Sequence, residues 1–316
     1  MTVSTFFLTP VPMMPVAMTV AAGLALGGLA LALASVIPAT AEKSRQIWPV
    51  FATEVVIVAV AVLPFVGGGL ILDLALAVLA IRVGFEATQV AFRRRAPARE
   101  RQGSVLRIRL LPLAAGVALA LAGTVAAQAP FLVLAGVGAV LMAGASLVRR
   151  GLSDPDQPLA IALEVLVFPA VPLVFFVAAA RDGANSGLLL LAFLLVETYD
   201  SYALLGGKLF GRRPAFPVLS PRKTIEGLAA GGAMLALTAG LVGPLIFDWN
   251  LAASLLVAAI IAAAAVVGDL AGSRLKRASG VKDYPAVLPR QGGALDIVDA
   301  WLIAGPALIV VASLSG

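Results

Sequence analysis

Long apolar runs alternate along this chain with short stretches that hold most of its charged residues. Most of the runs are roughly 17 to 23 residues long, the length of helix that crosses the hydrocarbon core of a bilayer. They are continuously apolar, whereas the strands of a transmembrane barrel alternate apolar and polar residues. The pattern therefore predicts an all-α, polytopic transmembrane helical bundle.

We expect about ten spans, within a range of roughly eight to ten, because each spanning helix needs one such run. A charged turn at Glu42–Arg45 is expected to follow the first span. The expected spans are Pro15–Ile37, Val50–Val66, Leu70–Ala91, Ile108–Ala127, Phe131–Val148, Leu159–Ala180, Gly187–Leu205, Leu228–Phe247, Leu251–Val267 and Ala300–Val311.

Positive charge is distributed unequally between the two ends of these spans. The turns on one side contain a single cation, Arg181, and the loops on the other side are basic. Basic loops remain in the cytoplasm, so both termini are expected on the non-cytoplasmic side. No Lys or Arg precedes Lys43, so the first span is expected to be retained in the protein. The basic loops are Lys43/Arg45, Arg93–Arg109, Arg149/Arg150, Lys208–Lys223 and Gly268–Asp299.

The composition fits a membrane protein and narrows the chemistry. Hydrophobic residues make up 61% of the 316 residues and charged residues 13%, against about 25% charged in a soluble domain. The formal charge of +6 is explained by cytoplasmic loops, so nucleic acid is not expected as a partner. With no Cys and no His, any metal must be held by oxygen atoms, which favours magnesium.

No linker separates a second soluble domain, so residues 1–316 are read as one membrane domain. Within it, residues 1–180 are expected to form the N-terminal spans. Residues 187–316 are expected to form a catalytic C-terminal half with two polar cytoplasmic loops, 206–227 and 268–299. We expect an integral protein of a bacterial inner membrane whose site faces the cytoplasm.

Two polar blocks precede the most charged loop. The first is Glu197–Tyr202, which places Asp200 inside an apolar span, where an ionisable group usually faces a polar cavity. The second is Ser220–Gly227, in which Ser220 at an N-cap and Pro221 behind it predict a helix start. Lys223 and Thr224 in its first turn would then form a phosphate site. A capped helix with a solvated lysine is the plainer alternative.

The third block is Gly268–Asp299. If the preceding helix continues, Asp269, Ser273 and Lys276 share one face of it. Asp296 and Asp299 likewise share a face after a flexible Gly-Gly pair. Carboxylates mixed with cations fit a metal-bridged polyphosphate. A solvated, salt-bridged loop is the alternative.

These blocks resemble the phosphatidate cytidylyltransferase (CDP-diacylglycerol synthase) family over roughly Glu197–Trp301. Upstream matches are Asp200 with a glycine-rich turn, Ser220-Pro221-x-Lys223-Thr224-x-x-Gly227, and Gly268-Asp269-Leu270. The family signature is matched by Ser273, Lys276, Arg277, Lys282, Asp283, Pro289, Gly292, Gly293, Asp296 and Asp299. The chain departs from it at Gly272, Tyr284-Pro285, Gln291 and Ile297.

The resemblance implies an enzyme that joins CTP to phosphatidic acid, or to a related lipid phosphate, and releases pyrophosphate. It implies a Mg²⁺ ion at Asp269, Asp296 and Asp299, with room for a second metal. Catalysis would rest on Asp269, Asp296, Lys276 and Lys223. Membrane lipids would be further partners, and a homodimer is possible in this reading. Substrate contacts would come from Asp200, Ser220, Lys223, Thr224, Ser273, Lys276, Arg277, Lys282, Asp283, Gly292 and Gly293.

Two other functions stay open. A CTP-dependent lipid kinase would release CDP instead of pyrophosphate. A transporter or non-catalytic membrane protein would keep its charges at mid-span positions. Such charges exist in or near the N-terminal spans, at Glu54, Asp73, Arg82, Glu86 and Glu164.

Overall fold

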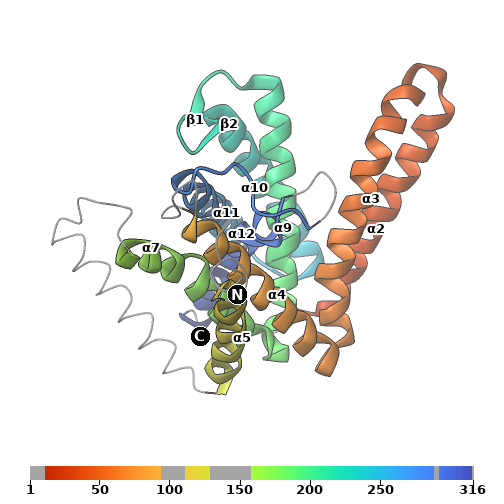
Figure 1. Cartoon of the computed structure of the whole chain (residues 1–316). Coiled ribbons are helices and arrows are strands. Elements are labelled where there is room, and N and C mark those ends of the chain that lie inside the picture. The colour runs from red at the N-terminus through yellow and green to blue at the C-terminus, as the bar shows by residue number, and fades with distance from the viewer. Residues whose placement is uncertain (1–10, 94–110, 129–157, 288–291, 315–316) are drawn as a thin grey trace.

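The computed structural model describes residues 11–93, 111–128, 158–287 and 292–314. Apart from a short hairpin of strands, every element in these ranges is helical (Figure 1). Within the described residues, seven helices are long and apolar enough to cross a membrane, which confirms an all-α polytopic membrane protein. These candidate spans are Met13–Val36, Ser44–Gly67, Ala160–Ala180, Gly183–Phe210, Ile225–Ile246, Leu251–Ala278 and Ala294–Ser313.

The N-terminal helices form a long hairpin that leans away from the other helices (Figure 1). Helix α2 (Met13–Val36) turns at Ile37 into α3 (Pro38–Gly67). The expected charged turn at Glu42–Arg45 was wrong, because these residues are already helical. Proline has no N–H and a fixed φ, so Pro38 at the first position of α3 favours a helix start there.

The next helices are less regular than the apolar pattern suggests. Helix α4 (Gly69–Phe92) carries charged side chains and is not among the seven candidate spans, and α5 (Leu111–Gln128) is an apolar helix with a shorter hydrophobic segment. The expected span Phe131–Val148 lies outside the described residues. The expected span Leu159–Ala180 is bent at Phe168, which has non-helical dihedral angles and precedes Pro169. Its parts are α7 (Pro158–Val165), η2 (Leu166–Ala170) and α8 (Val171–Ala180).

Three long helices make up the core of the C-terminal half. They are α9 (Gly183–Phe210), α11 (Leu251–Ala278) and α12 (Ala294–Leu314). Trp301 on α12 lies at their centre: its ring centroid is 4.7 Å from that of Phe176 and 4.9 Å from that of Phe193. Its indole Nε1 donates to the carbonyl of Leu189 at 2.7 Å, so the buried polar atom is satisfied.

Helix α10 (Ile225–Ile246) packs closely on α9 through glycines. A Cβ on Gly227 would lie 2.7 Å from the carbonyl oxygen of Ala203, and one on Gly231 would lie 2.8 Å from the Cβ of the same residue. Small residues let membrane helices approach to this distance. The expected glycine-rich turn, Gly207–Gly211, is helical as far as Phe210, and Gly211 is the C-cap of α9.

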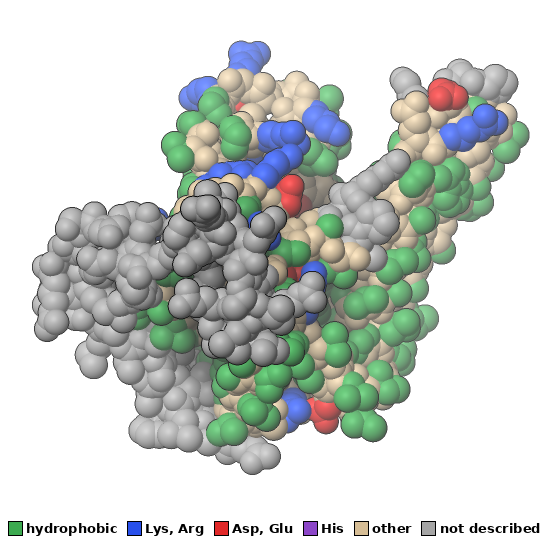
Figure 2. Space-filling model, viewed as in Figure 1, with side chains coloured by type: hydrophobic (Ala, Val, Ile, Leu, Met, Phe, Trp, Pro, Cys, Tyr) green, Lys and Arg blue, Asp and Glu red, His purple; other side chains and the backbone are tan. Residues whose placement is uncertain are grey.

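Between α9 and α10 the chain forms a small antiparallel hairpin, β1 (Pro214–Phe216) and β2 (Ser220–Thr224), in which Pro214 pairs with Thr224. Figure 2 shows Lys and Arg side chains gathered around this hairpin and hydrophobic side chains along the flanks of the helices below it. The polar loops of the C-terminal half therefore meet at one end of the helical bundle, as the sequence pattern predicts.

Candidate active site at the ends of α11 and α12

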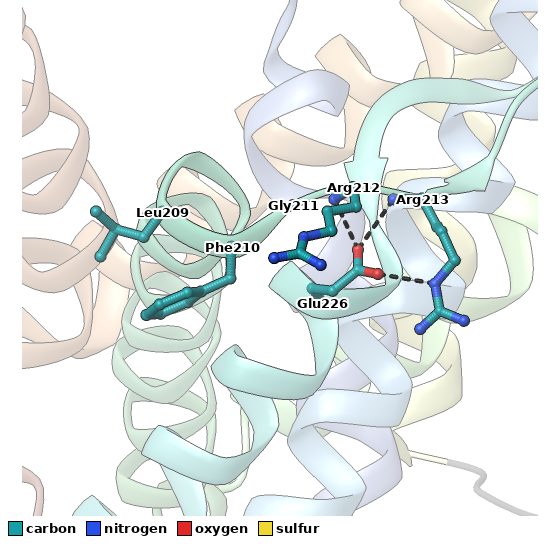
Figure 3. Close-up of a pocket in the computed structure, with 6 residues that line it drawn as sticks. All are labelled: Leu209, Phe210, Gly211, Arg212, Arg213 and Glu226. Atoms are coloured by element: carbon teal, nitrogen blue, oxygen red, sulfur yellow. Dashed lines mark hydrogen bonds and ion pairs between the residues drawn. The ribbon is translucent and has the colours of Figure 1, made fainter.

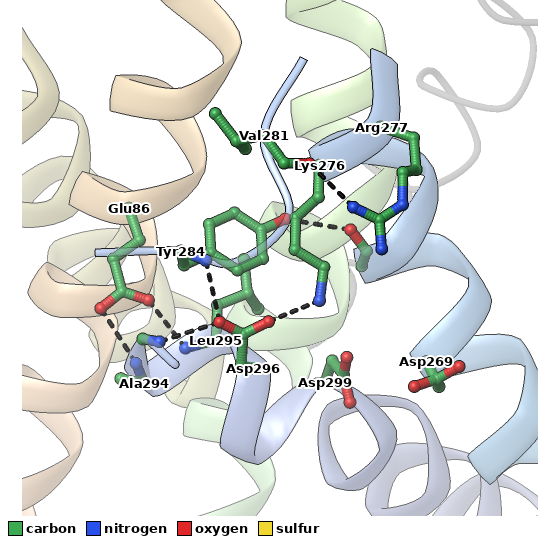
Figure 4. A network of polar contacts seen from close by, with 12 residues as sticks. Glu86, Asp269, Lys276, Arg277, Val281, Tyr284, Ala294, Leu295, Asp296 and Asp299 are labelled. Atoms are coloured by element: carbon green, nitrogen blue, oxygen red, sulfur yellow. Dashed lines mark hydrogen bonds and ion pairs between the residues drawn. The ribbon is translucent and has the colours of Figure 1, made fainter. Parts of the chain in front are cut away.

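The site begins with an ion pair between two helices. Helix α11 continues to Ala278, well past its apolar segment, so Lys276 lies in its last turn. Asp296 lies in the first turn of α12. The Lys276 Nζ and Asp296 Oδ1 atoms are 2.5 Å apart, and both side chains are largely buried (Figure 4). The two residues therefore join the end of one helix to the start of the next.

The carboxylate of Asp296 also orders the chain that leads into α12. Its Oδ2 atom accepts hydrogen bonds from the backbone N–H groups of Tyr284 (2.9 Å) and Gly293 (2.8 Å). A Cβ on Gly292 would collide with this carboxylate, so the position has room only for glycine. Asp296 is thus fixed by three donors.

A second cluster lies around Lys223 on β2. The Lys223 Nζ atom is 3.1 Å from Oδ2 of Asp269 on α11 and 3.9 Å from Oδ1 of Asp200 on α9. All three side chains are partly exposed, so a ligand can reach them. The structure thus brings together residues that are nearly seventy positions apart in sequence.

Asp299 lies between these two groups (Figure 4). It is buried on α12, and its Oδ1 atom accepts the N–H of Ala300 at 2.6 Å. Its Oδ2 atom points to Gly272 on α11, where an added Cβ would lie 2.7 Å away. Gly272 therefore gives the Asp299 carboxylate its space between the two helices.

Tyr284 replaces a residue of the family signature and fills the same region. Lys276 Nζ lies 5.4 Å from the centroid of its ring, within range of a cation–π contact. Its hydroxyl donates to the carbonyl of Gly272 at 3.3 Å. Burial raises the pKa of the Tyr284 phenol, so it stays neutral and keeps its proton for this bond. Two departures from the signature, at positions 272 and 284, thus contact each other.

The three aspartates differ in how well they suit a metal ion. Asp269 Oδ2 is buried and receives no hydrogen bond, since Lys223 lies near it but outside hydrogen-bonding geometry. Hard carboxylate oxygens of this kind suit Mg²⁺. Asp296, by contrast, has both oxygens engaged. Within the described ranges no three carboxylates form a ready metal-binding group, so ligation by Asp269, Asp296 and Asp299 stays a prediction.

The second polar block folds differently from the prediction. Ser220 and Pro221 lie in β2, not at a helix start, and α10 begins at Ile225. Its N-cap is Thr224, whose Oγ1 accepts the N–H of Gly227 at 3.1 Å. A threonine N-cap satisfies this orphan donor as well as serine does. The assignment of Ser220 as N-cap was wrong, and Lys223 reaches Asp269 from a strand.

The other predicted substrate residues surround this centre. Ser273 is buried on α11, on the same helix face as Lys276. Arg277 donates to the carbonyl of Val281 at 3.1 Å, and Lys282 and Asp283 are exposed in the following loop. The hydrogen bond that Arg277 makes is therefore to this loop and not to the aspartate cluster.

Two residues of the site were not predicted. On α4, Glu86 contacts the first residues of α12 (Figure 4), and Arg82 contacts Pro285 before that helix. They were noted only as charges inside an N-terminal span. Charged residues buried in spans are functional candidates by default, and that signal could have identified them. The other pairs among these charges, Asp73–Arg181 and Glu164–Arg274, are ion pairs between helices.

A separate basic groove of about 630 Å³ lies beside the β hairpin (Figure 3). Its floor is ordered by Glu226, which accepts the backbone N–H groups of Arg212 and Arg213 and pairs with the Arg213 side chain at 2.8 Å. Exposed Leu209 and Phe210 complete its wall. This groove is distinct from the aspartate cluster.

The fold and site together define an integral membrane protein with carboxylates and lysines clustered at one end of its helices. The chain belongs to the cytidylyltransferase family, whose model matches residues 48–315. It is 34% identical over 158 residues to the phosphatidate cytidylyltransferase of Staphylococcus haemolyticus (strain JCSC1435), covering 48% of this chain and 58% of that protein.

Two further relatives match shorter regions. The phosphatidate cytidylyltransferase of Staphylococcus saprophyticus (strain ATCC 15305) is 38% identical over 125 residues, or 39% of this chain and 48% of the relative. The uncharacterized protein YnbB of Escherichia coli (strain K12) is 38% identical over 124 residues, or 39% of this chain and 42% of that protein. The chain thus spans about half the length of the curated relatives it matches.

Proposed function

We propose that this protein is a membrane-embedded nucleotidyltransferase that converts CTP and phosphatidic acid, or a related lipid phosphate, into a CDP-lipid and pyrophosphate. One observation carries the proposal: Lys223 and Lys276 converge with Asp269, Asp296 and Asp299 at the end of the helices. This cluster lies in the part of the chain that matches the family. The similarity to staphylococcal phosphatidate cytidylyltransferases supports the same reaction.

The reaction is a substitution at phosphorus. A phosphate oxygen of the lipid attacks the α-phosphorus of CTP and forms a new P–O bond. The bond between the α-phosphorus and the bridging oxygen breaks, and pyrophosphate leaves with the electron pair. Such transfers depend on positioning and charge neutralisation more than on a protein nucleophile. The absence of Cys and His from the sequence is therefore compatible with this chemistry.

Each residue has a role in this proposal. Lys223 and Lys276 neutralise phosphate oxygens, while Asp296 holds Lys276 and the backbone before α12 in place. Asp269 and Asp299, with Asp296 as a third carboxylate, would hold Mg²⁺ and leave room for a second metal. Bound there, the metal would neutralise phosphate charge and polarise the reacting phosphate.

We further propose ten spans, with both termini on the non-cytoplasmic side and the site facing the cytoplasm of a bacterium. The basic side chains around the β hairpin support this orientation (Figure 2). A lipid phosphate would reach the site sideways from the cytoplasmic leaflet. Cysteines introduced one at a time into the cysteine-free chain, at Arg222 and at Arg181, test the orientation by labelling with a membrane-impermeant thiol reagent in intact cells. Labelling of the position 222 cysteine from outside the cell would refute it.

The reaction is tested with purified protein in detergent, labelled CTP, magnesium and phosphatidic acid. We expect a labelled CDP-lipid and an equal amount of pyrophosphate. Release of CDP with a phosphorylated lipid would establish a lipid kinase instead. A protein that binds CTP but does not turn over phosphatidic acid would require another lipid phosphate as acceptor. No binding of CTP would overturn the proposal.

A further inference from the structure

Glu86 is a fully buried carboxylate that reaches from the N-terminal half into the site. It lies on α4 with no exposed surface. Its Oε1 accepts the backbone N–H of Ala294 at 2.9 Å and its Oε2 accepts that of Leu295 at 2.8 Å. Arg82, one turn earlier on α4, lies 2.7 Å from Oε1. A buried charge is tolerated only when it is paired and hydrogen-bonded in this way.

The two amides that Glu86 binds are the first of helix α12. Such N–H groups have no partner within the helix, and a negative charge beside them is stabilising. They are normally satisfied by a cap residue adjacent in sequence. Here the carboxylate comes from a residue more than two hundred positions earlier. If Glu86 served only to neutralise Arg82 within α4, it would not need to bind these amides.

Arg82 holds a second point of the same segment. Its Nη2 atom donates to the carbonyl of Pro285 at 2.9 Å, while its Nε faces Glu86. Asp296 binds the neighbouring N–H groups of Tyr284 and Gly293 from the other direction. Tyr284, Pro285 and Gly293 are thus held between α4 and the Asp296 carboxylate.

Gly293 is the point where these contacts converge. A Cβ at this position would lie 2.4 Å from Glu86 Oε2 and 2.6 Å from the Cβ of Tyr284. Only glycine lets the Glu86 carboxylate approach the α12 amides so closely. This contact explains why glycine is needed at position 293, one of the two glycines of the signature.

We propose that Arg82 and Glu86 are positioning residues that clamp the N-terminus of α12 and thereby fix Asp296, and through it Lys276, in the geometry needed for catalysis. Neither residue contacts the reacting atoms. The effect on turnover rests on the proposed function, whereas the clamp itself does not. Arg82 and Glu86 are thereby assigned to the site at the start of α12 and not to a transport path.

The test compares Glu86→Gln with Asp73→Asn. Glutamine keeps the size of the side chain, but its NH₂ group is a donor and would face one of the α12 N–H donors. Arg82 would also lose its negatively charged partner. Asp73 is a matched control because it lies on the same helix in an ion pair with Arg181 at 2.9 Å. At 1.5 Å per residue it is about 20 Å from Glu86 along α4. Both variants remove one charge from one helix.

Two measurements are made on each protein. Hydrogen exchange of the peptide containing residues 294–299 should accelerate at least about tenfold in Glu86→Gln, as expected for loss of a charge-assisted hydrogen bond. The kcat should fall by a similar factor, with KM for CTP and lipid within about twofold, because the loss concerns geometry and not binding. Asp73→Asn should match the wild type in both.

Arg82→Lys provides a second variant that keeps the positive charge. Lysine has no planar fork, so it cannot contact both Glu86 and Pro285 as arginine does. We expect exchange and kcat between those of the wild type and Glu86→Gln. Wild-type exchange at residues 294–299 in Glu86→Gln, or a kcat equal to that of Asp73→Asn, would overturn the clamp. Failure of the wild type to bind CTP would instead refute the proposed function and leave the exchange comparison valid.

Discussion

Lys276 and Asp296 face each other across 2.5 Å at the point where α11 ends and α12 begins. Lys276 lies in the last turn of α11 and Asp296 in the first turn of α12. Each charge therefore interacts favourably with the dipole of its own helix. The same two side chains are the candidates for binding phosphate and for ordering the site. The contact therefore connects the stability of the helix junction with the proposed chemistry.

Asp296→Asn should remove the charge that holds Lys276 while keeping the shape of the side chain. We expect turnover to fall by roughly 10²- to 10³-fold, the effect of losing one preorganised polar group in an active site. Elution of the variant from size-exclusion chromatography should be unchanged. Activity within a few-fold of the wild type in the CTP and phosphatidic acid assay would contradict the role of Asp296.

Lys223→Gln should weaken the nucleotide site. Lys223 is the cation between Asp269 and Asp200, and its loss would remove the proposed charge-assisted contact to phosphate. We expect kcat/KM for CTP to fall by roughly 10- to 150-fold.

Arg222→Gln is the matched control, because successive strand residues point to opposite faces and Arg222 is exposed. Equal losses in the two variants would mean that general positive charge, and not Lys223, matters.

Trp301→Phe should destabilise the helix core without changing the site directly. Phenylalanine keeps the packing against Phe176 and Phe193 but removes the indole N–H that donates to the buried carbonyl of Leu189. We expect the free energy of unfolding in detergent to decrease by about 1–3 kcal/mol, seen as a lower Tm.

Trp48→Phe serves as the control for this substitution. Trp48 donates to Ser35 at 3.2 Å in the outlying α2–α3 hairpin and is partly exposed. Without the indole, Ser35 keeps its hydrogen bonds to the Leu31 carbonyl and to Ser44, so the Tm should change little. If Trp48→Phe lowered the Tm as much as Trp301→Phe, burial of the Trp301 hydrogen bond in the core would not explain the loss of stability.

The sequence predicted the membrane class and most helices because continuous apolar runs determine both. It also placed Asp269 and Lys276 on one helix face, since the helical period continues past the apolar segment of α11. It misplaced the start of α10, because Ser220-Pro221 carries the same local signal as an N-cap although β2 pairs with β1 there. Local patterns contain no information about such pairing.

The partners of Glu86 on α4 could not be predicted for a related reason. Nothing near Glu86 in sequence indicates that its partners are the amides of Ala294 and Leu295. The contact depends on how distant helices pack. It also depends on the absence of a side chain at Gly293, which only the three-dimensional arrangement explains.

Gly272→Ala tests whether the departure from the family signature at this position has become necessary. The added methyl group would lie 2.7 Å from Oδ2 of Asp299, so the carboxylate must turn away from the space it occupies between α11 and α12. A side-chain end can move, so we expect a small change in Tm but a loss of turnover of at least about tenfold, comparable to losing one charged interaction.

Gly232→Ala is the control for this last substitution, because no atom lies within 4 Å of the Cβ it would add on α10. Alanine is the better helix former by about 1 kcal/mol, so Tm should stay the same or rise and turnover should be unchanged. If Gly272→Ala also kept full turnover, the orientation of Asp299 seen here would not be needed for the reaction. Magnesium ligation would then have to be assigned to Asp269 and Asp296 without it.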